Sequence, residues 1–232
     1  MQKHISYFLL LCPLIISIAY SEVPTYNQEP SSVFLQKWLL CGSFPNPESA
    51  YDRQDKQNSG YYLDYLKSHG GESNLTVLPG QAETYENRSV SWIEYQSDSN
   101  LIYLDKVITT DPFVLAYAYC EIQSDTEKPC LMAVGSNDGI RIWINGEELL
   151  DVPERRGLRK DDNVIPVILH KGRNTVLLKI AETENLWGFC CRFLPFSTDL
   201  LKSDKNLFAI ETKQDGKAYL RYTGSKSLIG AI

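Results

Sequence analysis

Two tight-turn signals lie close together near the middle of the chain, and they constrain its fold more than any other feature. The first is Asn137-Asp138-Gly139, whose residue types tolerate the positive φ that a tight reversal needs. The second is Asn145-Gly146, the strongest short hairpin signal, because a type I′ turn requires positive φ at both central residues. Two reversals this close leave no length for a helix between them. The sequence therefore predicts an antiparallel sheet here.

The residues around these turns alternate as strands do. Isoleucines at 140, 142 and 144 alternate with Arg141 and Trp143, which is the pattern of a strand with one buried face. Short apolar runs separated by polar turns recur from residue 72 to residue 194, and this spacing is typical of a β-sandwich. One short helix is expected near residues 60–68, with an apolar stripe of Tyr62, Leu63 and Leu66. The sequence therefore predicts an all-β fold, an antiparallel β-sandwich with one short helix.

Several motifs occur in the order found in one known family. The run 38–47 (WLLCGSFPNP) resembles that family's WLVxGPFPNP opening, and residues 62–66 with Gly70-Gly71-Glu72 resemble its DYLxxLGGE. The central stretch 135–146 follows, and Trp187-Gly188-Phe189 closes the series. The chain is thus similar, over roughly residues 34–196, to galactose-binding-like (carbohydrate-binding-module-like) jelly rolls. The resemblance implies a jelly-roll β-sandwich, of a kind found mostly in non-catalytic parts of larger secreted proteins, often hydrolases.

The chain divides into four parts. Residues 1–21 have a basic start, an apolar run and an Ala-x-Ser site, as a signal peptide has. The apolar run is shorter than the roughly 20 residues of a transmembrane anchor, so we expect a secreted, periplasmic or cell-surface protein with no membrane segment in its mature form. Residues 22–32 read as a flexible leader and 33–196 as the β-sandwich module. Residues 197–232 read as a linker and a partial β hairpin, which could begin a truncated second domain.

Charge and cysteine content narrow the partners and the chemistry. The formal net charge of −6 argues against nucleic acid or an anionic membrane as partner, since both attract basic surfaces. Without the signal peptide, an odd number of cysteines remains, so at least one thiol is free or pairs with another chain. We hypothesise that Cys120 and Cys130 pair across a hairpin, whereas Cys190 and Cys191 point to opposite sides of one strand and do not pair.

Catalytic and metal-binding patterns are absent from the sequence. Outside the signal peptide the chain has two histidines, His69 and His170. It has no G-x-S-x-G, H-E-x-x-H or Gly-rich phosphate motif. The paired carboxylates Asp161 and Asp162 lie in a loop so rich in charge that solvation or ion pairing explains them better than glycoside hydrolysis. We therefore expect no enzyme, no cofactor and no metal at Cys or His ligands. A structural calcium, held by loop oxygens, is compatible with such folds.

Two functions from different classes remain open, with a fragment of a glycoside hydrolase or peptidase as a weaker third. The first is a carbohydrate-binding module, accessory to a hydrolase or other domain, with Trp187 as an aromatic platform beside Arg156, Asp161 and Asp162. The second is a structural or interaction domain with no small-molecule site, in which Trp187 belongs to the core and Asp138 only forms its turn. Exposed aromatics beside unpaired polar groups would favour the first, and burial of Trp143 and Trp187 the second.

Overall fold

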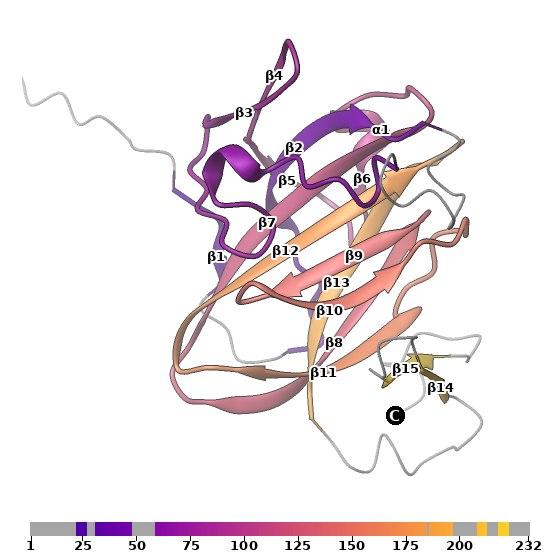
Figure 1. The fold of residues 1–232 in the computed structure, drawn as a ribbon. Coiled ribbons are helices and arrows are strands. Elements are labelled where there is room, and N and C mark those ends of the chain that lie inside the picture. Colours follow the sequence, from indigo (N-terminus) through magenta and orange to yellow (C-terminus); the bar gives the residue numbers. More distant parts are fainter. Residues whose placement is uncertain are drawn as a thin grey trace, which may run out of the picture.

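Two β-sheets face each other as a sandwich in the computed structural model (Figure 1), which describes residues 22–26, 31–47, 59–184, 186–196, 208–212 and 218–222. Sheet A has seven strands in the order β10-β9-β12-β7-β2-β5, with β1 beside β7. These strands are β1 (Thr25–Tyr26), β2 (Lys37–Pro45), β5 (Ile93–Gln96), β7 (Val114–Ser124), β9 (Ile140–Ile144), β10 (Glu147–Val152) and β12 (Gly172–Glu182).

Sheet B has six strands in the order β14-β15-β11-β8-β13-β6. A separate hairpin, β3–β4, projects from the body of the molecule (Figure 1). Apart from the parallel pair β1–β7, the described strands pair antiparallel, as the sequence predicts. The bounds are β3 (Ala82–Tyr85), β4 (Arg88–Ser91), β6 (Ile102–Tyr103), β8 (Lys128–Asn137), β11 (Asn163–Leu169), β13 (Gly188–Pro195), β14 (Phe208–Thr212) and β15 (Ala218–Tyr222).

Helical structure in the described residues is limited to single turns. The helix expected at 60–68 is replaced by turns around residue 60 and a 3-10 turn, η2 (Lys67–His69), which ends at Gly70 with φ 99°. The other is one α-helical turn, α1 (Leu104–Val107). None of the helices in the described ranges is long or apolar enough to cross a membrane.

Sheet A is buried on both faces, which is the feature that builds the pocket described below. Along β7, Ala116 and Ala118 enter the core between the sheets, whereas Leu115, Tyr117 and Tyr119 enter a second apolar cluster on the outer face. The second cluster is covered by the segment 59–92, which contributes Tyr61, Tyr65, Leu66, Val77 and Trp92. This covering segment therefore forms a third layer over sheet A.

The two turn signals of the sequence have different outcomes. Asn145 and Gly146 have φ 52° and 81°, which confirms a type I′ hairpin between β9 and β10. The Asn137-Asp138-Gly139 turn instead leads from β8 in sheet B to β9 in sheet A. It is fastened to β12 by a hydrogen bond from Asp138 N to Ala181 O. None of Asn137, Asp138 and Gly139 has a positive φ, so the tight reversal predicted there is wrong, and the segment is a bend that carries the chain from one sheet to the other.

The cysteine hypothesis is wrong for Cys120 and Cys130. These residues lie on β7 and β8, which are consecutive in sequence but belong to different sheets, so no cross-strand pair brings them together. Both thiols are free and buried, as are those of Cys41, Cys190 and Cys191. Cys191 enters the core between the sheets, and it does not bond to its neighbour Cys190.

Two expectations about the chain ends have different outcomes. The predicted signal peptide, residues 1–21, lies outside the described residues. At the other end, β14 and β15 form a hairpin that pairs with β11 and so extends sheet B. Whether residues 197–232 begin a second domain stays a prediction, as does the jelly-roll order of connections.

We expect the thiols of Cys120 and Cys130 to be inert in the folded protein. Burial raises the pKa of Cys130 to about 12 and that of Cys120 well above its usual value, so neither forms the reactive thiolate at neutral pH. Alkylation followed by peptide mapping should modify both residues only after denaturation. Recovery of one disulfide-linked peptide containing both would contradict this.

Candidate ligand-binding site

Trp187 is not the exposed platform that a sugar site at this position would need. Its side chain is 1% exposed and packs in the core between the sheets. The backbone explains this position, because Trp187 O accepts hydrogen bonds from the amides of Leu104 and Asp105 at the start of α1. Its indole Nε1 is buried without a hydrogen-bond partner among the described residues. Trp187 is therefore a core residue.

Arg156 lies at the centre of a network that fastens the 155–163 loop to the sandwich. Its Nη1 donates to Asp162 Oδ2 at 3.1 Å and to Asn163 Oδ1 at 2.6 Å, and its Nη2 donates to Ser136 Oγ at 2.7 Å. Asp138 accepts from the Arg156 amide at 3.0 Å and from the Thr183 amide at 2.9 Å. Asp138 therefore joins three loops, which goes beyond the turn-forming role expected of it.

Asp161 points away from this network and makes a different ion pair. Its carboxylate accepts from Arg192 Nε at 2.9 Å, and both side chains are fully buried. The structure thus brings Arg156 and Asp162 together and separates Asp161 from them. Asp162 is only 2% exposed. The loop expected to bind a sugar has an internal structural role at these positions.

The carboxyl group of Glu182 lies near the carboxylates of Asp138 and Asp105. Glu182 is 3% exposed, and its Oε2 has no hydrogen-bond partner among the described residues. Burial and, to a smaller degree, the neighbouring Asp138 and Asp105 carboxylates together raise the pKa of Glu182 to about 8. Within the described ranges no three Asp, Glu, His or Cys side chains are arranged to hold a metal ion. The structural calcium stays an untested expectation.

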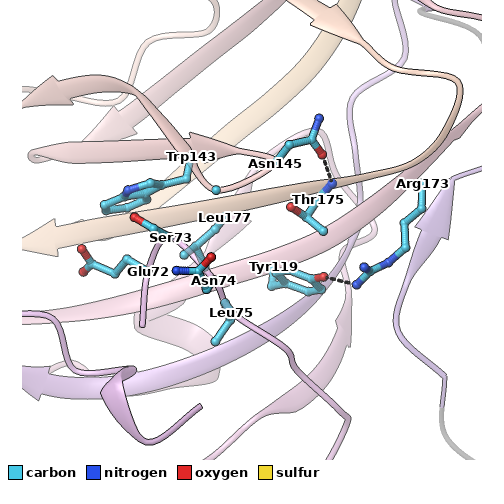
Figure 2. Close-up of a pocket in the computed structure, with 11 residues that line it drawn as sticks. Glu72, Ser73, Asn74, Leu75, Tyr119, Trp143, Asn145, Arg173, Thr175 and Leu177 are labelled. Carbon is cyan, nitrogen blue, oxygen red and sulfur yellow. Dashed lines mark hydrogen bonds between the residues drawn. The ribbon is translucent and has the colours of Figure 1, made fainter. Parts of the chain in front are cut away.

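A pocket of about 320 Å³ lies elsewhere, on the outer face of sheet A (Figure 2). Its floor is a row of cross-strand neighbours, since Leu177 on β12 lies opposite both Trp143 on β9 and Tyr119 on β7. These three side chains share one face because strand residues alternate sides. Their isoleucine and valine neighbours face the core between the sheets. The floor is therefore built by the same strands that build the core.

One wall of the pocket comes from the covering segment and meets the β9–β10 turn. Residues Ser73, Asn74 and Leu75, which we call the pocket wall, follow directly after Glu72. A Cβ atom at Gly146 would lie 2.1 Å from Ser73 O, so only glycine fits where the turn and the wall meet. Gly146 is thus required both by its positive φ and by this close approach.

Several polar groups around the pocket are uncommitted. The side chains of Ser73, Asn74 and Thr175 make no hydrogen bond within the part of the chain that the structure describes, and Figure 2 shows them beside Trp143 and Leu177. Arg173 donates from Nη2 to Tyr119 Oη at 3.0 Å and to Glu121 at 2.6 Å, while its side chain stays 55% exposed. The pocket therefore joins an aromatic floor with polar groups that can bind a ligand.

Sequence reasoning did not find this pocket. The sequence places Trp143 on the side of its strand away from the isoleucines, but it does not show whether a second layer covers that side. The available signal was that Tyr117, Tyr119, Arg141 and Trp143 all lie on the face opposite the core residues of their strands. A large aromatic row on that face indicates a covering layer, yet the segment that supplies it is irregular and has no period of its own.

We expect Trp187→Ala to destabilise the fold by about 3–5 kcal/mol, because it empties a buried indole site between the sheets. Chemical denaturation measures this. The neighbouring change Leu186→Ala is the control, since Leu186 is 60% exposed and should change stability by less than about 0.5 kcal/mol. Equal effects of the two changes would show that Trp187 is not core.

We expect Glu182→Gln to stabilise the protein more at pH 8 than at pH 5. The folded state raises the pKa of Glu182 from 4.5 to about 8, so between these values it holds a proton that the unfolded state releases, and stability falls as pH rises. Removing the charge should recover about 1–3 kcal/mol at pH 8. Thermal melting at both pH values, with the exposed Glu94→Gln as control, checks this. A pH-independent difference would rule out the buried charge as cause.

Comparison with known proteins gives only distant likeness. No family model matches the chain, and no curated protein matches it. Among solved structures, β-glucosidase from Kluyveromyces marxianus is 10% identical with a TM-score of 0.39, over 53% of this chain and 17% of that one. β-Glucuronidase from Ruminococcus gnavus is 13% identical with a TM-score of 0.33, over 88% and 28%. The chain spans less than a third of either enzyme, and likeness at this level carries no argument about function. The all-β fold agrees with the resemblance to galactose-binding-like jelly rolls, whose membership stays an expectation.

Proposed function

We propose that the chain is a non-catalytic module that binds a carbohydrate in the pocket over Trp143, Leu177 and Tyr119. The observation that carries the proposal is the meeting of an aromatic floor with uncommitted polar side chains in one concavity. We further propose that the module is an accessory part of a larger exported protein, as the family resemblance implies.

The chemistry of the pocket suits a sugar. Pyranose rings present apolar C–H surfaces beside hydroxyl groups, so a site for them needs both apolar cover and hydrogen-bonding groups. The half-buried Leu75 supplies apolar surface above the buried Tyr119 and Trp143 of the floor, while Ser73, Asn74 and Thr175 supply hydroxyl and amide groups. The volume of about 320 Å³ lies at the lower end of the roughly 300–1,000 Å³ typical of ligand pockets, which favours a small ligand.

A binding role is also supported by where the catalytic candidates lie. His69 Nδ1 lies 2.9 Å from Glu83, and His170 Nδ1 lies 3.2 Å from Glu127, and none of these four residues lines the pocket. The thiols of Cys190 and Cys41 are buried, and burial raises their pKa values well above the usual range. None of these histidines and cysteines therefore lines the pocket.

A structural or interaction domain is the second candidate, and one observation favours it. Trp143 and Trp187 are 2% and 1% exposed, so neither offers the open aromatic face typical of a sugar platform. Under this alternative the polar side chains around the pocket contact solvent or a protein partner, and the pocket has no sugar ligand.

We expect the chain to bind a glycan on an array, and Thr175→Val and Asn74→Ala each to weaken that binding at least tenfold, about 1.4 kcal/mol. Both side chains line the pocket and are free to bond a ligand. Calorimetric titration of the best array ligand measures the effect. Thr126→Val is the matched control, because it makes the same change at an exposed position in the β7–β8 loop. If the folded chain binds no glycan, the structural alternative stands.

A further inference from the structure

The carboxylate of Glu72 is held from three directions just where the pocket wall begins. Tyr117 Oη donates to Glu72 Oε1 at 2.7 Å, and Lys179 Nζ donates to the same oxygen at 2.9 Å. Arg141 Nη1 reaches Glu72 Oε2 at 3.3 Å. The Glu72 amide in turn donates to Asp64 Oδ2 at 3.2 Å. Glu72 is therefore fixed at both its backbone and its side chain.

The three donors form a single row across sheet A. Lys179 on β12 lies opposite Tyr117 on β7 and opposite Arg141 on β9. The pocket floor is the next row on the same face, two residues along each strand. Arg141 also joins the rows directly, since its guanidinium carbon lies 4.8 Å from the centre of the Trp143 ring. The row that holds Glu72 is therefore in register with the floor of the pocket.

This cluster of charges is deeply buried. Lys179 is 0% exposed and Glu72 8%, and Lys179 Nζ also donates to Leu63 O at 2.5 Å. Burial lowers the pKa of Lys179 to about 8 even though Glu72 opposes that shift. Burying an ion pair in this way adds little stability over apolar side chains of similar size. Stability alone is therefore a poor reason for these residues to be charged.

The apolar contacts of the covering segment do not set its position by themselves. Tyr65, Leu66 and Trp92 bury apolar surface against sheet A, but the hydrophobic effect is non-directional. A carboxylate with three aimed donors fits only one place on the sheet. Ser73 follows Glu72 directly and meets the turn at Gly146. Other directed bonds hold the segment farther from the wall, such as that from Tyr61 Oη to Ile140 O at 2.9 Å, whereas Glu72 is the attachment next to the wall.

We propose that Lys179 is a positioning residue of the ligand pocket, acting with Arg141 and Tyr117 through Glu72 to place the pocket wall. Neither Lys179 nor Tyr117 lines the pocket itself. The proposal depends on the proposed carbohydrate-binding function only where it predicts a change in ligand affinity. The placement of the wall is a property of the protein without ligand.

Hydrogen–deuterium exchange tests the placement directly on the full chain without ligand. The double change Glu72→Leu and Lys179→Met replaces the ion pair by apolar groups of similar size. We expect the hydrogen-bonded amides within 73–76, those of Asn74 and Thr76, to exchange at least about tenfold faster, while those of β7 and β12 keep their protection. The thermal midpoint should shift by only a few degrees, as for other buried pairs replaced in this way.

The buried pair Asp161 and Arg192 provides the matched control. Asp161→Leu with Arg192→Met removes a fully buried ion pair that does not line the pocket, and it should leave exchange at 73–76 unchanged. Glu72→Gln is a second, milder variant, which keeps an acceptor for Tyr117 and loses the charge. If the apolar double variant fails to fold, faster exchange at 73–76 in Glu72→Gln still supports the proposal.

The outcomes separate this inference from the proposed function. Unchanged exchange at 73–76, or faster exchange everywhere to the same degree, overturns the positioning role. Selective loosening of the wall supports it, and an accompanying tenfold loss of glycan affinity extends it to the ligand. Selective loosening in a protein whose wild type binds no glycan supports the positioning role and rejects the carbohydrate proposal.

Discussion

Sheet A carries large apolar side chains on both faces, and this double burial is the constraint on which the rest of the structure depends. A sheet in a two-layer sandwich needs cover on only one face, but Leu115, Tyr117 and Tyr119 point away from sheet B. At about 25 cal/mol per Å², leaving that face in water would weaken the fold considerably. The segment 59–92 is therefore an integral layer of the domain, although it has little regular structure.

An irregular layer also needs hydrogen-bond partners for its buried backbone amides and carbonyls, because it has no strand pairing to supply them. Side chains meet this need. Asp64 accepts from the amides of Leu66 and Glu72, and Lys179 donates to the carbonyl of Leu63. The motif residues around Asp64 and Glu72 are thus explained by local satisfaction of buried polar groups.

The sequence predicts local features well and contacts between distant segments poorly. Alternation and turn chemistry identify the strands, and Asn145-Gly146 identifies its hairpin, because these signals depend on neighbouring residues. Cys120 and Cys130 were paired wrongly because strand order within sheets depends on the whole chain. The sequence leaves Trp187 open between a core residue and an exposed platform, because composition alone does not show which loop aromatic enters the core. The sequence identifies Arg156 and Asp162 as part of a dense polar group, but two further partners of Arg156 lie far away in sequence, Ser136 at the end of β8 and Asp138 in the bend that follows it.

The alternation of side chains along β7, β9 and β12 also separates the residues of the core between the sheets from the residues of the pocket floor. Even positions such as 118, 142 and 178 build the core, whereas odd positions such as 119, 143 and 177 build the pocket floor. Substitutions at the odd positions can reshape what the pocket admits while the packing between the two sheets stays the same. The covering segment can vary with them, because it contributes no residue to that packing. The pocket floor and the core between the sheets are thus built by alternate residues of the same strands, so a side chain of the floor can change without a change in any side chain of that core.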